Sequence, residues 1–304
     1  MSEPRMNEQS EAKIIDGRHE AYVFRQKIAK EIDRFQDERR ATPGLAVVLV
    51  GDDPASKVYI ASIAGHAKET GMGWFERTLP ADATEDELLT VIRGLNKNAK
   101  VNGILLPRPL PERISAAVAT RAVDPDKDVD GTHVVNAGRL FAGEPGLAPC
   151  TALACLKLLK GHLGDLSGRR ATVIGRSAVV GKPVALMLAS EDCTVTLAHS
   201  RTLDLAAECR KADILVAAAG SPRLVKGDWI KPGATVIDVG INKIEKKDAP
   251  PEIVGDVDFE AARKTAGAIT PVPGGVGPMT IACQLANTVI AACRKHGIDA
   301  PDFL

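Results

Sequence analysis

The chain has 304 residues, of which 39 are lysine or arginine and 39 are aspartate or glutamate, so its formal net charge is zero. Neutral charge and an aromatic content of only 3% give no reason to expect nucleic acid or a membrane surface as a partner. Six cysteines without a Cys-x-x-Cys pair, and no stretch that reads as a signal peptide or membrane span, predict a cytoplasmic protein with neither disulfides nor a metal site.

The first half of the chain alternates helix and strand patterns. Gly44–Val50 is an uninterrupted apolar run and predicts a buried strand. Thr84, with Glu87 three residues later, forms a capping-box pattern that begins a helix. In chain order we expect a helix over residues 12–39, a strand over 44–50, helices over 56–70 and 84–98, and a strand over 103–106 that runs into a proline-rich loop.

The second half continues this alternation, which is typical of parallel sheets with right-handed crossovers. Strands are expected near residues 171–175, 194–198, 213–218 and 234–239, and a last helix over 279–296. We therefore predict an α/β fold with two domains. A Rossmann-type dinucleotide-binding domain would span residues 150–277. A second α/β domain would combine residues 1–149 with 278–304, because the last helix returns to it.

A glycine turn follows the apolar run Arg170–Ile174 and opens into a segment that is compatible with a helix. Gly175, Ser177 and Gly181 are small enough to let a ligand approach the backbone closely. In doubly wound sheets, a strand, a glycine turn and a helix start present backbone N–H groups to a pyrophosphate. Because Gly-x-Ser-x-x-x-Gly differs from the usual Gly-x-Gly-x-x-Gly, an ordinary strand–helix turn stays open as an alternative.

The segment that would read the ribose follows the next strand. An NAD enzyme tends to place an acidic residue there, whereas this chain has His199, Ser200, Arg201 and Thr202. Hydroxyl and guanidinium donors, with Arg176 from the glycine turn, suit a 2′-phosphate that a carboxylate would repel. The sequence thus predicts NADP as the cofactor. The alternative is that both arginines are solvated surface charges.

A loop rich in glycine and proline, Pro271–Pro278, precedes the last helix. Its glycines would let a flat ligand lie against the backbone, while its prolines would hold the shape of the loop. We expect substrate and nicotinamide to meet in a cleft between the two domains.

Six motifs, spread from residue 50 to residue 280, resemble the bifunctional methylenetetrahydrofolate dehydrogenase/methenyltetrahydrofolate cyclohydrolase (FolD) family. The resemblance covers nearly the whole chain from residue 12 onward. The motifs are Val50-Gly51-Asp52-Asp53-Pro54-Ala55-Ser56-x-x-Tyr59, Pro125-Asp126-Lys127-Asp128-Val129-Asp130-Gly131, Gly175-Arg176-Ser177 with Val180-Gly181, His199-Ser200-x-Thr202, Val236-Ile237-Asp238-Val239-Gly240-Ile241-Asn242, and Thr270-Pro271-Val272-Pro273-Gly274-Gly275-Val276-Gly277-Pro278-Met279-Thr280.

The resemblance implies a folate-binding catalytic domain, a folate as small-molecule substrate, and a homodimer. Asp130 would bind the pterin ring through paired hydrogen bonds, and Tyr59 would stack near the folate or hydrogen-bond to it. From the residues alone, Asp130 also fits a turn before Gly131, and Tyr59 fits a packed helical aromatic. The expected NADP residues are Gly175, Arg176, Ser177, Val180, Gly181, His199, Ser200, Arg201, Thr202 and Ile241. The expected folate residues are Tyr59, Asp130, Pro273, Gly274, Gly275, Val276, Gly277, Pro278 and Thr280.

Two positions depart from the family pattern. Ile63 stands where the family has a lysine, four residues after Tyr59 and so on the same face of the helix. Pro107 stands where the family has a glutamine that holds this lysine. A milder change is Ala152, where the family usually has proline.

Loss of the lysine and glutamine bears on only one of the family's two reactions. Cyclohydrolysis needs a positioned acid/base, which neither isoleucine nor proline supplies. Hydride transfer needs alignment of two bound molecules and exclusion of water. We therefore predict an NADP-dependent methylenetetrahydrofolate dehydrogenase with cyclohydrolase activity lost or strongly reduced. The expected catalytic positions are Tyr59, Asp130, Ile63 and Pro107.

Several alternatives stay open. A changed pocket would accept a different one-carbon carrier or folate-like substrate, and a non-catalytic paralogue would bind folate or NADP for regulation or assembly. His66, three residues after Ile63, would act either as a substitute base or as an exposed helical histidine. Arg108 would pair with a carboxylate or phosphate of the substrate, or be a solvated loop charge.

Overall fold

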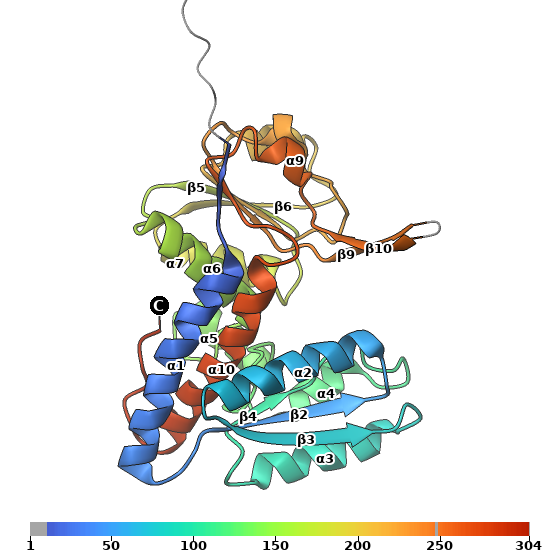
Figure 1. Ribbon diagram of the computed structural model, residues 1–304, viewed down its shortest axis with the longest axis vertical. Helices are drawn as coiled ribbons and strands as arrows, with labels where there is room; N and C mark the ends of the chain where they lie inside the picture. The colour runs from blue at the N-terminus through green and yellow to red at the C-terminus, as the bar shows by residue number, and fades with distance from the viewer. Residues whose placement is uncertain (1–10, 247–248, 304) are drawn as a thin grey trace, which may run out of the picture. The chain divides into compact units, whose positions relative to one another are not determined.

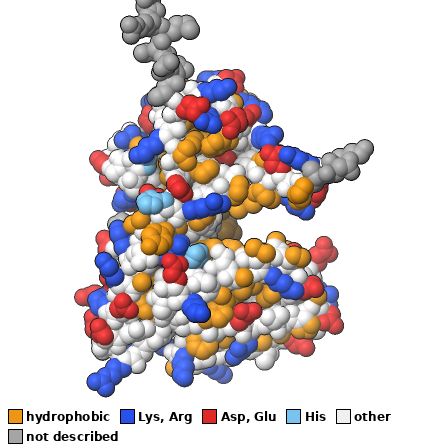
Figure 2. Space-filling model, in the orientation of Figure 1, with side chains coloured by type: hydrophobic (Ala, Val, Ile, Leu, Met, Phe, Trp, Pro, Cys, Tyr) orange, Lys and Arg blue, Asp and Glu red, His pale blue; other side chains and the backbone are white. Residues whose placement is uncertain are grey.

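The computed structural model describes residues 11–246 and 249–303, which form two compact units (Figure 1). One unit combines residues 11–18 with 155–277, and the other combines residues 19–154 with 278–303. Lysine and arginine side chains are interspersed with aspartate and glutamate side chains on the face shown in Figure 2, as the zero net charge leads one to expect.

The unit of residues 19–154 and 278–303 contains a three-stranded parallel sheet in the order β3-β2-β4. All seven residues of the central strand β2 are buried, so the apolar run marks the core strand as predicted. Helices α2 and α3 cover opposite faces of the sheet (Figure 1). The bounds are β2 Gly44–Val50, β3 Gly73–Leu79, β4 Gly103–Leu105, α2 Pro54–Glu69 and α3 Glu85–Lys97.

Helix α3 shows how the sequence determines a local structure. The predicted capping box is present, since Thr84 accepts a hydrogen bond from the backbone N–H of Glu87 and the Glu87 carboxylate accepts one from that of Thr84. The apolar face of the helix packs on alternate residues of β2. Burial of Leu88 and Ile92 stabilises this packing by roughly 2 kcal/mol each.

The other unit contains a six-stranded parallel sheet in the order β1-β11-β8-β7-β5-β6. The predicted strands of the second half are all present, within a residue or two of the expected bounds. Together with the three-stranded sheet they confirm the two-domain α/β fold. The bounds are β1 Lys13–Ile14, β5 Arg170–Ile174, β6 Thr194–Ala198, β7 Ile214–Ala217, β8 Thr235–Asp238 and β11 Ala268–Ile269.

The start of the chain differs from the expectation. The predicted helix over residues 12–39 begins only at Gly17, because α1 spans Gly17–Arg39 and is preceded by strand β1. The backbone N–H groups of Lys13 and Ile15 donate to the carbonyl oxygens of Gly267 and Ile269 beside β11. Residues 11–18 therefore belong to the unit of residues 155–277 and not to the domain of residues 1–149.

Among the remaining elements, α7 and α10 confirm the helix expected after the glycine turn and the last helix expected over residues 279–296, and α10 begins three residues earlier than predicted. An antiparallel hairpin, β9 with β10, departs from the otherwise parallel pairing. The bounds are α4 Ala116–Ala122, α5 Val134–Ala142, α6 Cys150–Leu163, α7 Gly181–Ser190, α8 Leu205–Arg210, a 3₁₀ turn Gly227–Trp229, β9 Asn242–Lys246, β10 Ala249–Val254, α9 Phe259–Ala262 and α10 Val276–Lys295.

Helix α10 corrects the expectation that no segment is long and apolar enough to span a membrane. Val276–Lys295 passes that test by length and composition, but 78% of its apolar window is buried inside the protein. The core helix of a soluble protein has this character. All six cysteines are also buried and none forms a disulfide, as predicted.

Candidate active site

The glycine turn lies where the strand order of the parallel sheet reverses. Strand β5 is flanked by β6 on one side and by β7 on the other, and doubly wound sheets bind ligands at such a switch point. Gly175 follows β5 with φ of +113°, and a Cβ there would lie 2.1 Å from the carbonyl oxygen of Ala218, which follows β7. A Cβ at Gly181 would lie 1.9 Å from the carbonyl oxygen of Gly175. Glycine at both positions therefore lets these segments approach and leaves the backbone of the turn open.

Ser177 organises the start of helix α7. Its Oγ accepts hydrogen bonds from the backbone N–H groups of Val180 at 3.1 Å and Gly181 at 3.3 Å. Arg176 and Ser177 themselves are exposed. The turn thus offers a guanidinium group and a helix N-terminus in one place, and both attract the negative charge of a pyrophosphate.

A tight turn at the end of β6 holds the segment expected to read the ribose. The backbone N–H of His199 donates to Thr202 Oγ1 at 2.9 Å, and that of Arg201 donates to His199 Nδ1 at 3.1 Å. His199 and Thr202 are thereby used inside the turn, while Ser200 and Arg201 are exposed. Neither Arg176 nor Arg201 forms an ion pair with a residue that the structure describes, so both guanidinium groups are available to a 2′-phosphate.

Two buried aspartates hold the loops after β7 and β8, on the side of the glycine turn. No role was predicted for either from the sequence. Asp256 is fully buried and accepts hydrogen bonds at 2.6–2.9 Å from the backbone N–H groups of Ala219, Gly220 and Ser221. Asp238 accepts three backbone hydrogen bonds, and burial raises its pKa to about 6. Ile241, an expected NADP contact, is 72% exposed in the loop that follows Asp238. These carboxylates shape the loops after β7 and β8 and do not face the cofactor turn themselves.

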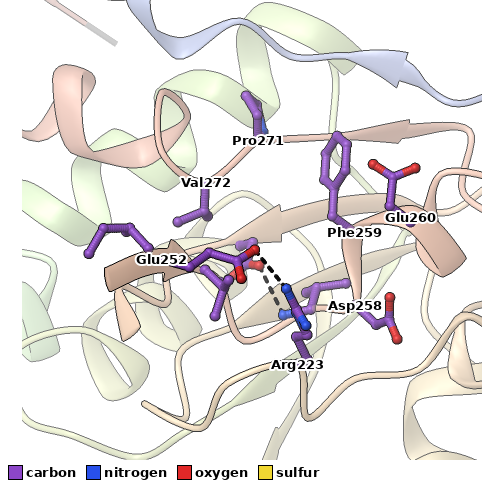
Figure 3. A pocket seen from close by; sticks show the side chains of 12 residues that line it. Arg223, Glu252, Asp258, Phe259, Glu260, Pro271 and Val272 are labelled. Carbon is purple, nitrogen blue, oxygen red and sulfur yellow. Dashed lines mark hydrogen bonds and ion pairs between the residues drawn. The ribbon is translucent and has the colours of Figure 1, made fainter. Parts of the chain in front are cut away.

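A cavity of about 470 Å³ lies in the same unit beside the loop of glycines and prolines (Figure 3). Pro271, Val272 and Phe259 line it, and Arg223 Nη2 lies 2.8 Å from Glu252 Oε1 at its edge (Figure 3). None of its described lining residues comes from the glycine turn or the turn after β6. The cavity is therefore separate from the expected cofactor site.

The loop of glycines and prolines is anchored to strand β8. Thr270 Oγ1 accepts a hydrogen bond from the backbone N–H of Asp238 at 2.8 Å. Gly274 has φ of +113°, and a Cβ at Gly275 would lie 2.6 Å from the carbonyl oxygen of Pro271. The loop is shorter than predicted, because the expected folate residues Val276, Gly277, Pro278 and Thr280 lie in the first turns of α10 and leave only Pro273, Gly274 and Gly275 in the loop.

A polar cluster in the other unit joins the two predicted folate residues, both half-buried, through a third, buried residue. Gln284 Nε2 lies 2.9 Å from Tyr59 Oη and 3.2 Å from Asp130 Oδ1, and the Tyr59 hydroxyl donates to Gln284 Oε1 at 3.2 Å. Gln284 comes from α10 and is only 2% exposed. Gln284 was not predicted from the sequence, because it is a single glutamine in an apolar helix and belongs to no motif.

Burial determines how the cluster titrates. It raises the pKa of the Tyr59 hydroxyl, and the negative charge of Asp130 adds to this effect, so the hydroxyl stays protonated at neutral pH. Burial also raises the pKa of Asp130, while the hydrogen bond from Gln284 and the charge of Arg108 act in the opposite direction. The protonation state of Asp130 therefore depends on the balance between its burial and the effects of Gln284 and Arg108.

The two departures from the family pattern place apolar groups in this unit. Ile63 is fully buried on α2, one turn after Tyr59, and Pro107 is buried just after β4. Isoleucine offers no proton, and proline has neither a side-chain donor nor a backbone N–H. Neither position can therefore take part in proton transfer.

His66 and Arg108 were the two candidates for compensation. His66 Nδ1 lies 3.0 Å from Glu69 Oε2, which also pairs with Arg25 at 3.2 Å. The imidazole therefore contacts Glu69 and not a residue of the Tyr59 cluster. Arg108 is exposed and donates to Thr120 Oγ1 at 3.0 Å, and it lines a small cavity together with Asp130. The structure thus brings Arg108, but not His66, toward the Tyr59 cluster.

The three aspartates of the Pro125–Gly131 motif have three different tasks. Asp126 pairs with Arg139 at 2.7 Å. Asp128 accepts a hydrogen bond from the backbone N–H of His133 at 2.7 Å and so fixes the loop. Only Asp130 faces the Tyr59 hydroxyl and Gln284, which favours the ligand-binding interpretation of this residue over that of a turn former.

Comparisons with known families match nearly the whole chain. Residues 15–130 match the catalytic domain of tetrahydrofolate dehydrogenase/cyclohydrolase, and residues 149–296 match the NAD(P)-binding domain of the same enzymes.

Relatives of similar length are known. The chain is 55% identical over 293 residues to the bifunctional protein FolD of Cereibacter sphaeroides, covering 96% of this chain and 99% of that protein. It is 56% identical over 290 residues to the bifunctional protein FolD 2 of Paracoccus denitrificans, covering 95% and 96% of the two chains.

Solved structures have the same fold. The bifunctional FolD enzyme of Campylobacter jejuni superposes with a TM-score of 0.89 at 41% identity, covering 93% of this chain and 99% of that one. The Trypanosoma brucei FolD enzyme, solved with NADP and an inhibitor, gives a TM-score of 0.89 at 38% identity and covers 94% and 99% of the two chains.

Proposed function

The chain belongs to the tetrahydrofolate dehydrogenase/cyclohydrolase family, and on this basis we propose that it is an NADP-dependent methylenetetrahydrofolate dehydrogenase whose cyclohydrolase activity is lost or strongly reduced. The observation that carries the second part is the pair of apolar residues Ile63 and Pro107 at the positions of the family's lysine and glutamine. The names of the relatives include both activities, so the proposal is a departure of this chain from its relatives.

The residues of the cofactor unit fit a bound NADP. A side chain at Gly175 or Gly181 would fill the turn that the pyrophosphate approaches. Arg176 and Arg201 would hold the 2′-phosphate with charge-assisted hydrogen bonds, because no described carboxylate takes up either guanidinium group. NADP supplies the nicotinamide that accepts a hydride, and the protein's part is to hold and orient it.

Asp130 would bind the folate in its ionised form. A carboxylate accepts two N–H groups of a pterin ring side by side, and Gln284 Nε2 fixes its orientation from the protein side at 3.2 Å. Tyr59, held by the same amide, would present its ring to the substrate. Hydride transfer requires no proton from these residues, so the missing lysine does not prevent it.

Hydrolysis of the methenyl product requires acid/base catalysis, which hydride transfer does not. A water molecule must be activated and a proton must reach the ring nitrogen as the ring opens. Ile63 is 0% exposed and apolar, the Tyr59 hydroxyl has a raised pKa, and His66 is held by Glu69. The acid/base that the family's lysine provides therefore has no replacement among these three residues.

The decisive experiment assays both reactions on the purified protein. Reduction of NADP by methylenetetrahydrofolate is followed by NADPH absorbance, with NAD as the comparison, and the decay of methenyltetrahydrofolate is followed separately. We expect NADPH formation together with methenyltetrahydrofolate decay no faster than in buffer. The Campylobacter jejuni enzyme, measured in the same buffer, serves as the bifunctional control. Hydrolysis clearly above the spontaneous rate would disprove the loss of cyclohydrolase activity.

The loss can also be tested by reversal. We expect the double variant Ile63→Lys/Pro107→Gln to hydrolyse methenyltetrahydrofolate at least about tenfold faster than the parent, because a positioned base typically contributes 10²–10⁴-fold to a rate. The variant Ile63→Met/Pro107→Ala changes the same two side chains without adding a base and is the matched control. Equal rates for the two variants would speak against the assignment to these positions.

Assembly and location are part of the proposal. The family resemblance favours a homodimer in the cytoplasm, and six buried free cysteines fit a reducing compartment. Sedimentation velocity on the purified protein at micromolar concentration distinguishes the dimer from the monomer by mass.

A further inference from the structure

A second cavity, of about 570 Å³, lies in the unit of residues 19–154 and 278–303. The end of α3, the loop before β4 and the end of α10 surround it. Asn102 lies at the amino end of β4, whereas Pro107 and Arg108 follow the carboxyl end of the same strand. The cavity therefore lies at the amino end of β4, whereas the expected folate site lies at its carboxyl end.

Cationic side chains dominate this basic cavity. Two carboxylates, Asp124 and Asp126, line it, whereas its five cationic lining residues are Lys97, Lys127, Arg139, Arg294 and Lys295. Only Arg139 is paired, with Asp126 at 2.7 Å; the other four cations form no ion pair with any residue in the described part of the chain. Positive charge is therefore in excess here, although the whole chain is neutral.

Lys127 places one of these charges in the wall of the cavity. It is 7% exposed, and its Nζ donates to the carbonyl oxygens of Leu95, Asn96 and Asn98 at 2.6–3.1 Å. These contacts use its three N–H donors at the negative end of the α3 dipole, so Lys127 contributes charge to the cavity wall but no free donor. Burial lowers the pKa of Lys127 and the charge of Lys295 lowers it further, whereas the charge of Asp124 acts in the opposite direction.

Arg294 and Lys295 stand on the other side, at the end of α10. Lys295 Nζ uses one donor, to the carbonyl oxygen of Ala99 at 2.7 Å. Arg294 forms no side-chain hydrogen bond with a described residue, which leaves its guanidinium donors for a ligand. Burial lowers the pKa of Arg294 and the nearby charge of Arg139 adds to this effect, whereas the charge of Asp126 acts in the opposite direction. Because cationic lining residues outnumber the two aspartates, the cavity attracts an anion.

We propose that the basic cavity lined by Lys97, Lys127, Asn102, Arg294 and Lys295 is a binding site for a phosphate ester with two or more negative charges. The guanidinium group of Arg294 matches the paired oxygens of a phosphoryl group, and lysine ammonium groups add charge without fixed geometry. The volume lies in the range of small-molecule sites and would accept more than a single phosphate. The site is distinct from both the folate cluster and the cofactor turn.

The test is a calorimetric titration of pyrophosphate into the purified full-length protein. We expect saturable binding in the parent, a dissociation constant about tenfold higher in Arg294→Gln, and one about a hundredfold higher in Arg294→Gln/Lys97→Gln. Both side chains are exposed, so neither change should unfold the protein. Lys100→Gln removes an exposed cation that neighbours the cavity without lining it, and it should bind like the parent.

The cofactor turn also attracts phosphates, and the variants separate the two sites, because they leave residues 175–202 unchanged. Dehydrogenase activity, measured in parallel, should be the same in the parent and in all three variants, and binding is read without turnover. Equal dissociation constants for the parent and the double variant would overturn the proposal, as would weakening by Lys100→Gln to the same degree. Citrate bound as tightly as pyrophosphate would overturn the assignment to phosphate.

Discussion

The side-chain amide of Gln284 connects Tyr59 and Asp130 through hydrogen bonds. A single side chain donates both to the tyrosine hydroxyl and to Asp130, so it fixes the orientation of the aromatic ring and of the carboxylate at once. It also favours the ionised form of Asp130 against the effect of burial. Under the proposed function, Gln284 would be a positioning residue that acts on the folate through its two neighbours.

This role predicts the effect of Gln284→Met, a change that keeps the length of the side chain and removes its hydrogen bonds. We expect the KM for methylenetetrahydrofolate to rise about tenfold, as for the loss of a charge-assisted hydrogen bond worth 1.5–3 kcal/mol, with kcat changed less than about threefold. Initial rates at varied folate and saturating NADP measure both constants. Gln26→Met, an exposed glutamine of α1, is the matched control.

The same variant should alter the pH dependence. If Asp130 binds the folate as the carboxylate, as proposed, kcat/KM should fall as the pH drops through its raised pKa. Removal of the Gln284 hydrogen bond raises that pKa further and should move the acid limb of the profile to higher pH. An acid limb that stays in place would contradict a link between Gln284 and Asp130.

Sequence reasoning identified part of this cluster. Tyr59 and Asp130 follow from motifs, because each lies in a local pattern that the family shares. Gln284 does not, since it is separated from Tyr59 by 225 positions and lies in a helix whose pattern indicates only a core. For His66, helical spacing left two roles open, a substitute base or an exposed helical histidine, because it says nothing of Glu69, which lies 3.0 Å from the imidazole.

At the level of elements, the glycine turn is closely packed. The backbone after β5 touches the backbone after β7, and the first turn of α7 packs against the backbone of Gly175. No side chain fits at these two contacts. Under the proposed function, binding of the pyrophosphate and packing of the sheet would depend on the same glycines.

We expect Gly175→Ala to weaken NADP binding at least about a hundredfold and to lower stability by well over 2 kcal/mol, because its Cβ would lie 2.1 Å from a carbonyl oxygen in a backbone conformation with positive φ. Gly164→Ala is the matched control. Its φ of +70° carries a similar conformational cost of about 1–2 kcal/mol, but nothing lies within 4 Å of the added Cβ. Fluorescence titration with NADPH and thermal unfolding measure the two effects.

Elements with strong local signals were predictable, and short or polar ones were not. The apolar run of β2 and the capping box of α3 carry their own information. Strand β1 has two residues and exists only because β11 pairs with it. The hairpin of β9 and β10 is largely exposed, and the prolines of β10 interrupt it, so no hydrophobic period marks it.

At the scale of the whole molecule, each compact unit carries one of the two expected ligand sites. The turns at residues 175–181 and 199–202 belong to one unit, and Tyr59, Asp130 and Gln284 belong to the other. Ligand binding should therefore protect separate parts of the chain.

Hydrogen exchange can measure this separation. NADP at a hundred times its dissociation constant should stabilise the protein by about 2.7 kcal/mol and slow exchange at residues 175–182 and 199–202. A folate should slow exchange at residues 59–63, around residue 130 and at the start of α10. Protection of both sets of amides by NADP alone would show that the units respond together.

Strand β1 has a consequence for how the protein is made. Lys13 leaves the ribosome long before its partner Ala268, which lies far later in the chain. At ordinary elongation rates this delay is on the order of ten to fifty seconds. During that time the outer strand of the cofactor sheet has nothing to pair with. A fragment that begins after residue 18 would lack the strand altogether and would present β11 as an unprotected edge, which is a site for aggregation.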